Sequence, residues 1–391
     1  MPFCTRRCDY CAFATWSGRD ELMGAYVAAC RSEMARAYDE GLGPAATVFV
    51  GGGTPSTLPP DLLVELLEGV RRVEGAEVTV ECNPESTSQA LVAAMRESGV
   101  TRVSLGVQSL QEHVLAGLGR HHGPGDVERA VALVGAAGFE TFNVDLIYGG
   151  AGETEDDWRR TLEGVLRDLD PPPPHVSAYA LTVEPGTPLW RDAARHPDDD
   201  VQADRYLLAD ATLSASGLEW YEISNFARPG HECRHNLSCW RQGDYRGFGC
   251  AAHSHSAGRR WWNIRSIERY IAAASSGRPT VAGEQRLGPR ARAVEALRLS
   301  LRTRDGVPGS ALPDLPELED LLDRRDGRAV LTPRGRLLAN EVALRLLEPE
   351  GGGRRRPRNV AARPAARSAG AARSTGRIPG KLRRPDCCPA P

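Results

Sequence analysis

Three cysteines lie within eight residues near the start of the chain, at Cys4, Cys8 and Cys11. The spacing C-x3-C-x2-C lets a short loop hold its thiolates at three corners of a cubic [4Fe–4S] cluster. Cubane clusters normally take four cysteine ligands, so a loop that offers three leaves one iron open, as a catalytic zinc keeps one open position. A chance group of buried thiols and a three-cysteine zinc site remain alternatives, although zinc loops usually use paired C-x2-C units.

A glycine-rich turn follows the next apolar run, where Val50 leads into Gly51-Gly52-Gly53-Thr54. Because glycine has no side chain, the backbone of such a turn can approach a ligand closely and present its N–H and C=O groups. Glycines also mark ordinary tight connections between a strand and a helix. By itself, the turn predicts either a ligand site or a tight connection.

Polar residues recur at or near the ends of later apolar runs, as Glu81, Gln108 and Asp145. A carboxylate in such a place is costly to bury without a partner. A ligand hydroxyl or amine would supply one, and so would the first turn of the next helix. Because the carboxyl ends of barrel strands meet at one face, the repetition favours a shared ligand site.

The elements that must position these residues alternate between β-rich apolar runs and amphipathic stretches. The predicted strands are residues 47–50, 78–81, 103–107, 142–147 and 176–181. The predicted helices are residues 21–40, 61–72, 88–98, 126–137 and 155–168. Strands separated by helices of this length indicate βαβ units and a parallel sheet. The expected fold is α/β, a complete or partial (β/α)6-type barrel.

Four segments are predicted along the chain. They are a barrel core at 1–220, a His-, Cys- and Trp-rich segment at 221–285, a small winged-helix-like domain at 286–348 and a basic tail at 349–391. The third segment reads as helices at 293–301, 317–322 and 334–347, with a turn at Asp326-Gly327 and a short hairpin. The tail has almost nothing to bury and is expected to be disordered.

The composition is that of an ordinary globular protein, with 41% hydrophobic and 26% charged residues. No apolar run approaches the roughly 18 residues of a membrane span, and the cysteine loop leaves no room for a signal peptide before it. The ten cysteines are therefore expected to be thiols in a reducing cytoplasm. The basic tail is compatible with peripheral contact at an anionic membrane, but without aromatic residues it is expected to be inert.

Several longer motifs resemble a known family. They are residues 101–109 (TRVSLGVQS), 118–121 (LGRH), 143–149 (NVDLIYG) and 175–179 (HVSAY). Together with the three-cysteine loop, they resemble the radical S-adenosylmethionine (SAM) superfamily and, within it, the oxygen-independent coproporphyrinogen III oxidase family. Residues 221–227 (YEISNFA) and 233–237 (CRHNL), with Trp240, are similar to its haem-chaperone branch, HemW.

The resemblance implies a site for each cofactor. In this superfamily the open iron of the cluster chelates the amino and carboxylate groups of SAM. The resemblance implies that Cys4, Cys8 and Cys11 bind the cluster and that Tyr10 packs behind the adenine of SAM. Contact with the methionine and ribose of SAM is implied for Gly52, Gly53, Thr54 and Glu81. Gln108, Arg120 and Asp145 match family positions that line the cavity. Some relatives bind a second SAM there.

Two functions compete within the family. Coproporphyrinogen III dehydrogenases, which decarboxylate their substrate by radical chemistry, have a further cysteine two residues after the third, where this chain has Phe13. The haem chaperones have Phe there, and residues 235–240 resemble their H-N-x-x-Y-W element, with Cys239 in place of Tyr. The resemblance therefore implies a haem chaperone that binds haem through His235. A thiolate ligand from Cys239 and an unligated, hydrogen-bonded His235 remain alternatives. The chaperone's implied partners are a haem-accepting protein and an electron donor such as flavodoxin or ferredoxin. Whether SAM is cleaved stays open.

A reading of another class is a zinc-stabilised nucleic-acid-binding protein. Six residues could ligate zinc, because their types and short spacings permit it: Cys233, His235, Cys239, Cys250, His253 and His255. Against nucleic-acid binding, the winged-helix-like segment has no concentrated basic face.

The chain also departs from the family in two places. Relatives have a strand and the phrase Y-x-H-I-P-F-C before the first cysteine, so the first barrel strand is expected to be missing. Residues 149–153 (GGAGE) stand where relatives show G-L-P-G-Q.

Overall fold

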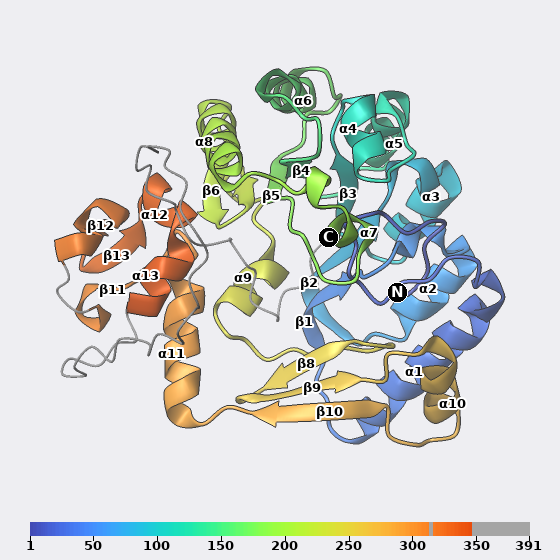
Figure 1. Cartoon of the computed structure of the whole chain (residues 1–391). Helices are drawn as coiled ribbons and strands as arrows, with labels where there is room; N and C mark the ends of the chain where they lie inside the picture. The colour runs from blue at the N-terminus through green and yellow to red at the C-terminus, as the bar shows by residue number, and fades with distance from the viewer. Residues whose placement is uncertain (313–315, 346–391) are drawn as a thin grey trace, which may run out of the picture.

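A computed structural model describes residues 1–312 and 316–345 of the chain. Its centre is a curled, open sheet of seven strands in the order β1-β2-β3-β4-β5-β7-β6 (Figure 1). The first five run parallel: β1 (Ala45–Val50), β2 (Arg72–Cys82), β3 (Arg102–Gln108), β4 (Thr141–Tyr148) and β5 (His175–Ala180). The last two, β7 (Asn225–Ala227) and β6 (Glu219–Glu222), continue the sheet in antiparallel pairing. The predicted α/β partial barrel is confirmed.

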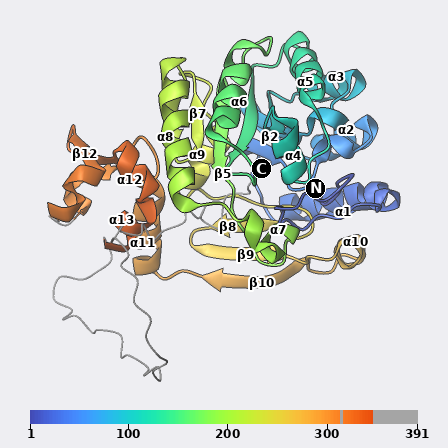
Figure 2. The same ribbon diagram turned by 45° about the horizontal axis from the view of Figure 1, so that its top comes forward.

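Helices cover the convex face of this sheet (Figures 1 and 2). They are α1 (Met23–Asp39), α2 (Pro60–Glu68), α3 (Gln89–Glu97), α4 (Glu112–Gly117), α5 (Pro124–Ala136), α6 (Glu155–Arg167) and α8 (Asp199–Ala215). Every residue of β3 is buried, as expected for a parallel strand that is covered on both faces. On the concave face the strands carry polar residues such as Ser104 and Asp145, so this face is suited to hold ligands.

The helix predicted at 61–72 is wrong at its end, because α2 stops at Glu68. Gly69 follows at the helix C-cap, and Arg72 then pairs with Ala45 of β1. The strand predicted at 78–81 is therefore only the second half of β2, which is 11 residues long. Pairing with a distant strand outweighed the local helical pattern, a common limit of sequence-based assignment.

A second sheet, absent from the predicted elements, contains β8 (His253–Ser256), β9 (Arg259–Asn263) and β10 (Val281–Arg286). Together with α10 (Ile267–Ser275) it lies beside α1 (Figures 1 and 2). The buried carboxylate of Glu33 joins the two parts. It accepts hydrogen bonds from Tyr270 Oη at 2.6 Å, Thr280 Oγ1 at 2.7 Å, Asn263 Nδ2 at 2.8 Å and Gly249 N at 3.1 Å.

Glu33→Gln is expected to lower the free energy of unfolding by about 2 kcal/mol, because the Gln amide group would face buried donors that lose their acceptor. The measurement is urea unfolding followed by circular dichroism. Glu21→Gln, at an exposed position before the same helix, is the matched control and should change stability little. Equal unfolding midpoints for Glu33→Gln and the control would contradict this role of Glu33.

The C-terminal unit begins with α11 (Pro289–Ser300) and packs against α8 (Figure 1). It contains a three-stranded antiparallel sheet of β11 (Val307–Pro308), β13 (Arg328–Leu331) and β12 (Leu322–Arg325), followed by α12 (Pro333–Leu337) and α13 (Ala339–Arg345). The hairpin turns at Asp326 and Gly327, both with positive φ, which suits a tight two-residue turn. Arg336 of α12 forms an ion pair with Asp210 of α8 at 2.6 Å.

Two predicted C-terminal helices differ from the observed elements. The helix predicted at 317–322 is a 3-10 helix, Pro316–Leu321, that runs directly into β12. The helix predicted at 334–347 is split into α12 and α13, and its last two residues lie outside the described ranges. The winged-helix-like assignment and the four-segment division stay predictions, although the main sheet continues past residue 220 through β6 and β7. The predicted tail at 349–391 lies outside the described residues.

Within the described ranges, no helix is long and apolar enough to cross a bilayer.

Candidate cluster and cofactor site

The cysteine loop (residues 3–16) is held at both its ends and in its middle by backbone contacts. Cys4 N donates to Trp16 O at 3.1 Å, and Thr54 N from the glycine turn donates to Phe3 O at 2.8 Å. In the middle, Asp9 N donates to Leu118 O at 3.1 Å. The loop therefore lies across the connections that follow β1 and β3, at the carboxyl ends of the parallel strands, where α/β folds place their ligands.

The glycine turn is shaped by this close approach. Gly52 has a φ of 112°, which residues with side chains rarely adopt. A Cβ atom on Gly53 would lie 2.6 Å from Phe3 O and 3.2 Å from Cys4 Sγ. Glycine is thus needed here because the turn packs directly on the cysteine loop, and Gly52 N also donates to the Glu81 carboxylate at 3.0 Å.

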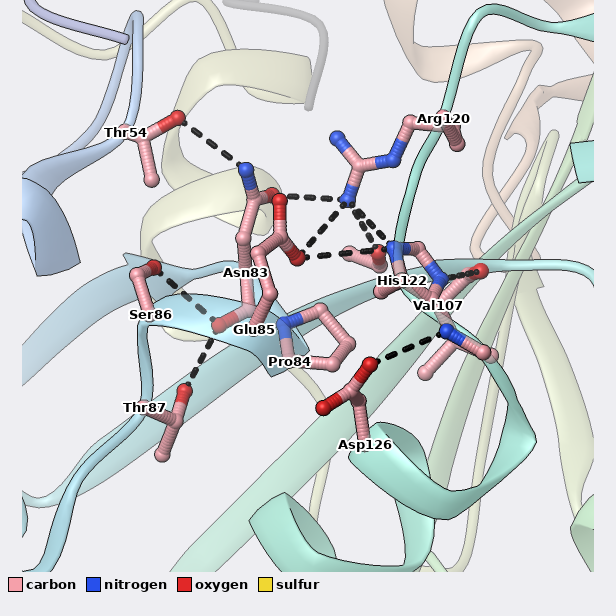
Figure 3. A network of polar contacts seen from close by, with 12 residues as sticks. Thr54, Asn83, Pro84, Glu85, Ser86, Thr87, Val107, Arg120, His122 and Asp126 are labelled. Atoms are coloured by element: carbon pink, nitrogen blue, oxygen red, sulfur yellow. Dashed lines mark hydrogen bonds and ion pairs between the residues drawn. The ribbon is translucent and has the colours of Figure 1, made fainter. Parts of the chain in front are cut away.

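A chain of hydrogen bonds joins two of the cysteines, and Figure 3 shows its middle part, from Thr54 through Asn83 to Arg120. Thr54 Oγ1 donates to Cys4 Sγ at 3.4 Å and accepts from Asn83 Nδ2 at 3.2 Å. Arg120 Nη2 donates to Asn83 Oδ1 at 2.9 Å, and Arg120 Nη1 donates to Cys8 Sγ at 3.6 Å. Side chains from the connections that follow β1, β2 and β3 therefore link the sulfur atoms of Cys4 and Cys8.

Arg120 is in turn surrounded by fixed partners. Its Nη2 also donates to Gly106 O at 2.8 Å, and Glu85 lies 3.9 Å from it and 3.4 Å from His122 (Figure 3). Burial alone would lower the pKa of Arg120, but Tyr10, Cys8 and Glu85 raise it above its usual value. Burial would raise the pKa of Glu85, but the hydrogen bond from His122 and the charge of Arg120 lower it. The guanidinium is therefore a permanent cation next to Cys8.

The three cysteines fit a cluster site in their chemistry. All three are free and half-buried, and they line one small pocket of ≈ 60 Å³. Burial raises the pKa of the Cys4 and Cys11 thiols, so metal binding there must displace their protons. Across residues 1–312 and 316–345, no three His, Cys, Asp or Glu side chains gather as ligands of a single metal ion. A cubane separates its ligand sulfurs more widely than a single ion does.

Every predicted SAM residue lines this small pocket, namely Tyr10, Gly52, Gly53, Thr54, Glu81, Gln108, Arg120 and Asp145. Among the buried polar atoms of the pocket, Gln108 Oε1 and Arg120 Nε have no hydrogen-bond partner among the described residues. Gln108 also has a φ of 64°, a conformation that costs a side-chain-bearing residue energy and tends to occur at functional sites. The residues present therefore suit a polar ligand beside the cluster.

Asp145 of β4 is buried and has side-chain partners within the sheet. Its carboxylate accepts from Ser104 Oγ at 2.6 Å and from Asn143 Nδ2 at 3.0 Å. Neighbouring side chains of the sheet thus supply the hydrogen bonds that a buried carboxylate needs. From the sequence, only a ligand or the first turn of the next helix was expected in this role.

A much larger cavity of ≈ 1170 Å³ adjoins the small pocket and shares Tyr10, Cys11, Phe13 and Gly52 with it. Its size is above the roughly 300–1,000 Å³ of most ligand pockets. From α9 (Arg234–Trp240), His235 and Cys239 line the same cavity. The structure thus brings the predicted haem residue and the cysteine loop to one space, although they are more than 200 residues apart.

Glu77 of β2 holds α9 in this position. Its carboxylate accepts from Arg234 N and His235 N, both at 2.9 Å, and contacts Cys233 Sγ at 3.5 Å. The first N–H groups of a helix have no partner within the helix, and a carboxylate there also favours the helix dipole. Glu77 therefore acts as an N-terminal cap supplied by another element.

The imidazole of His235 is fixed on three sides. It stacks on Phe49 with ring centroids 5.2 Å apart, its Nδ1 lies 3.1 Å from Thr47 Oγ1, and its Nε2 lies 3.9 Å from Cys239 Sγ. Burial lowers the pKa of His235, against an opposing effect of Glu77. The ring is therefore neutral near pH 7 and has a lone pair to offer a metal.

Glu77→Ala is expected to loosen α9, because loss of a helix cap costs about 1 kcal/mol. The measurement is amide hydrogen exchange, in which the amides at the start of α9 should exchange several-fold faster. Glu74→Ala, at an exposed position on the same strand, should leave their exchange unchanged. Equal protection of α9 in Glu77→Ala and wild type would show that the cap is dispensable.

The six residues of the zinc alternative do not come together. Cys233 contacts Glu77, and His253 stacks on Trp262. His255 Nδ1 lies 3.1 Å from Gly243 O, and Cys250 N donates to the Tyr26 hydroxyl. Only His235 and Cys239 are neighbours, so the described residues give the zinc alternative no support.

Five residues of the site were missed in the sequence: Thr47, Glu77, Asn83, Glu85 and His122. Glu77 could have been found because it is an acid within an apolar run. Asn83 and His122 could have been found because they lie close in sequence to predicted site residues. The contacts of Thr47 and Glu85 are made only by folding, and their types carry no signal.

Comparisons with known proteins agree with this geometry. The model of the radical SAM superfamily matches residues 1–165. Haem chaperone HemW of Mycobacterium tuberculosis is 44% identical over 368 residues, covering 89% of this chain and 93% of that protein. The HemW proteins of Synechocystis and Escherichia coli are 36% and 37% identical, covering 82% and 65% of this chain and 80% and 68% of their own.

Among solved structures, coproporphyrinogen III oxidase (HemN) of Escherichia coli, described as a radical SAM enzyme, has a TM-score of 0.76. It is 21% identical to this chain and covers 88% of each chain, a likeness that shows the fold alone. The identity with the HemW proteins extends over most of both chains. The chain therefore belongs to the HemW family of the radical SAM superfamily.

Proposed function

We propose that this chain is a radical-SAM-type haem chaperone, which binds haem in the large cavity and delivers it to an acceptor protein. The observation that carries the proposal is the cavity itself, because His235 and the cysteine loop line one space. Membership of the HemW family, whose relatives are named haem chaperones, supports it. We place the protein in the cytoplasm, where its thiols stay reduced.

Cys4, Cys8 and Cys11 are proposed to hold a [4Fe–4S] cluster, with SAM in the small pocket beside it. Bound there, the cluster would offer an open iron for SAM and an electron that an external donor such as flavodoxin or ferredoxin supplies. The chain's own residues position these groups. Arg120 and Thr54 donate to ligand sulfurs, while Glu81 and Gln108 present polar atoms to the same pocket.

His235 is proposed as the haem ligand, through Nε2. Its Nδ1 forms a hydrogen bond with Thr47 Oγ1. In metal sites, a hydrogen bond to the ring nitrogen that does not bind the metal fixes the orientation of the histidine in the same way. Phe49 supplies an aromatic surface next to the ring. Cys239 lies one helical turn away and lines the same cavity, so its thiol is the second candidate ligand.

Anaerobic reconstitution followed by haem titration tests the proposal. Wild type should bind haem with a defined Soret band and pass it to an apo-cytochrome acceptor in a mixing experiment. His235→Ala should lose the band, Cys239→Ala should change its position little, and the double variant should behave as His235→Ala. Identical spectra and affinities for wild type and His235→Ala would remove His235 as ligand, and absence of haem binding by wild type would overturn the function.

The dehydrogenase alternative is tested in the same preparations. Phe13 stands where those enzymes have a further cysteine, and the similarity to HemN shows the fold alone. We therefore expect no formation of protoporphyrinogen from coproporphyrinogen III under anaerobic conditions with SAM and a reductant. Clear conversion would assign the chain to that enzyme class instead.

A further inference from the structure

Two arginines, Arg246 and Arg265, also line the large cavity. Arg246 is half-buried and Arg265 is exposed. Over the described parts of the chain, neither guanidinium has an acidic partner or a hydrogen-bond acceptor. Two cations that line a cavity without counter-charges are suited to an anionic ligand.

Arg246 is held in place by rings instead of by a carboxylate. Its guanidinium lies 5.3 Å from the ring centre of Trp261 and 5.6 Å from that of Phe248. Its buried Nε has no hydrogen-bond partner. Cation–π contacts orient a guanidinium and leave its N–H groups available, so Arg246 is prepared to bind a carboxylate in its plane.

Three other charged side chains of the cavity wall already have hydrogen-bond partners. Arg234 donates to Gly75 O at 2.6 Å, and Arg302 donates to Arg298 O at 2.7 Å. The acid Asp244 accepts from Ser256 Oγ and Ala257 N, both at 2.9 Å. Glu184 is the other acid in the wall. The free positive charge of the cavity is therefore concentrated at Arg246 and Arg265.

We propose that Arg246 and Arg265 bind the two propionate carboxylates of haem, with the iron directed toward His235 on α9. The proposal rests on haem binding in the large cavity and adds the group that sets its orientation and selectivity. The conjugated ring would lie among the apolar and aromatic side chains of the cavity. Charge-assisted hydrogen bonds from an arginine to a carboxylate are stronger than neutral ones and can be bidentate.

The test compares two probes, haem and its dimethyl ester, in which both carboxylates are blocked. Arg246→Gln and Arg265→Gln should each weaken haem binding about tenfold, since a hydrogen bond to a charged group contributes about 1.5–3 kcal/mol. Arg246→Lys, which keeps the charge, should recover part of the affinity. The ester should bind wild type and both Gln variants alike. Arg269→Gln, exposed on α10 and away from the cavity wall, is the control and should match wild type.

The outcomes separate this inference from the proposed function. Wild type that binds neither probe would overturn the function itself. Wild type that binds haem and ester equally, with Gln variants that match it, would overturn the inference and leave haem binding intact. Because Arg246 packs on Trp261, its variant is accepted only if circular dichroism is unchanged. The exposed Arg265 provides the test in any case, since its substitution removes no packing.

Discussion

Replacing any one of Cys4, Cys8 and Cys11 with alanine is expected to abolish the brown absorption of the reconstituted [4Fe–4S] cluster and, with it, SAM binding. Two remaining thiolates cannot hold three corners of a cubane. The loop that carries the three residues is fixed by its contacts with the glycine turn, so the variants should still fold. The measurements are iron and sulfide content, the visible spectrum and SAM binding by equilibrium dialysis under anaerobic conditions.

Cys82 supplies a matched control, because it lines the same small pocket. Burial raises the pKa of its thiol to about 12, and its Sγ contacts Val80 O, so it is a protonated side chain of the core. Cys82→Ala should therefore keep a full cluster that responds to SAM. Loss of the cluster in this variant would mean that four cysteines bind it, and the open iron on which SAM chelation depends would not exist.

The sequence predicted those parts of the molecule that depend on short-range patterns. The cysteine loop and the glycine turn are each contained in a few residues, and the alternation of apolar runs with amphipathic stretches fixed the parallel order of β1 to β5. The family resemblance is confirmed by the identity with HemW proteins. The roles assigned to single residues, from Tyr10 to His235, stay predictions that the shared cavities support.

What the sequence could not predict depends on contacts between distant residues. The end of α2 was misplaced because β2 begins where it pairs with β1. Glu77 caps a helix more than 150 residues later in the chain, and Glu33 receives donors from positions 249 to 280. The apolar run around Glu77 could have marked it as unusual but not as a helix cap, and no local pattern marks Glu33. For the same reason, the sequence did not single out Arg246 and Arg265, which the fold brings to the wall of the cavity that His235 also lines.

Arg120 is the residue whose loss should disturb the site most without removing a ligand. Its side chain is 6% exposed and contacts Asn83, Gly106, Cys8 and Glu85. Arg120→Leu would remove the hydrogen bonds of the guanidinium to Asn83 and Gly106 and its ion pair with Glu85. Loss of a hydrogen bond from a charged group costs about 1.5–3 kcal/mol. Urea unfolding of the protein without cofactors should show this loss of stability. Arg120→Lys should recover the charge but not the hydrogen bonds to both Asn83 and Cys8.

The pH dependence of the same variant distinguishes a lost ion pair from lost packing. In wild type the pKa of Glu85 is held below its ordinary 4.5, so the pair contributes stability above that pH, which is lost as the pH falls through the lowered pKa. As the pH falls from 7 to below the lowered pKa of Glu85, wild type should therefore lose more stability than Arg120→Leu does. Arg129→Leu, which removes a 49% exposed arginine paired with Asp126, should cost well under 1 kcal/mol and keep the wild-type pH profile. If Arg120→Leu kept that profile too, the cation would have no electrostatic role at Glu85, and Arg120 would act on the site only through its hydrogen bonds to Asn83, Gly106 and Cys8.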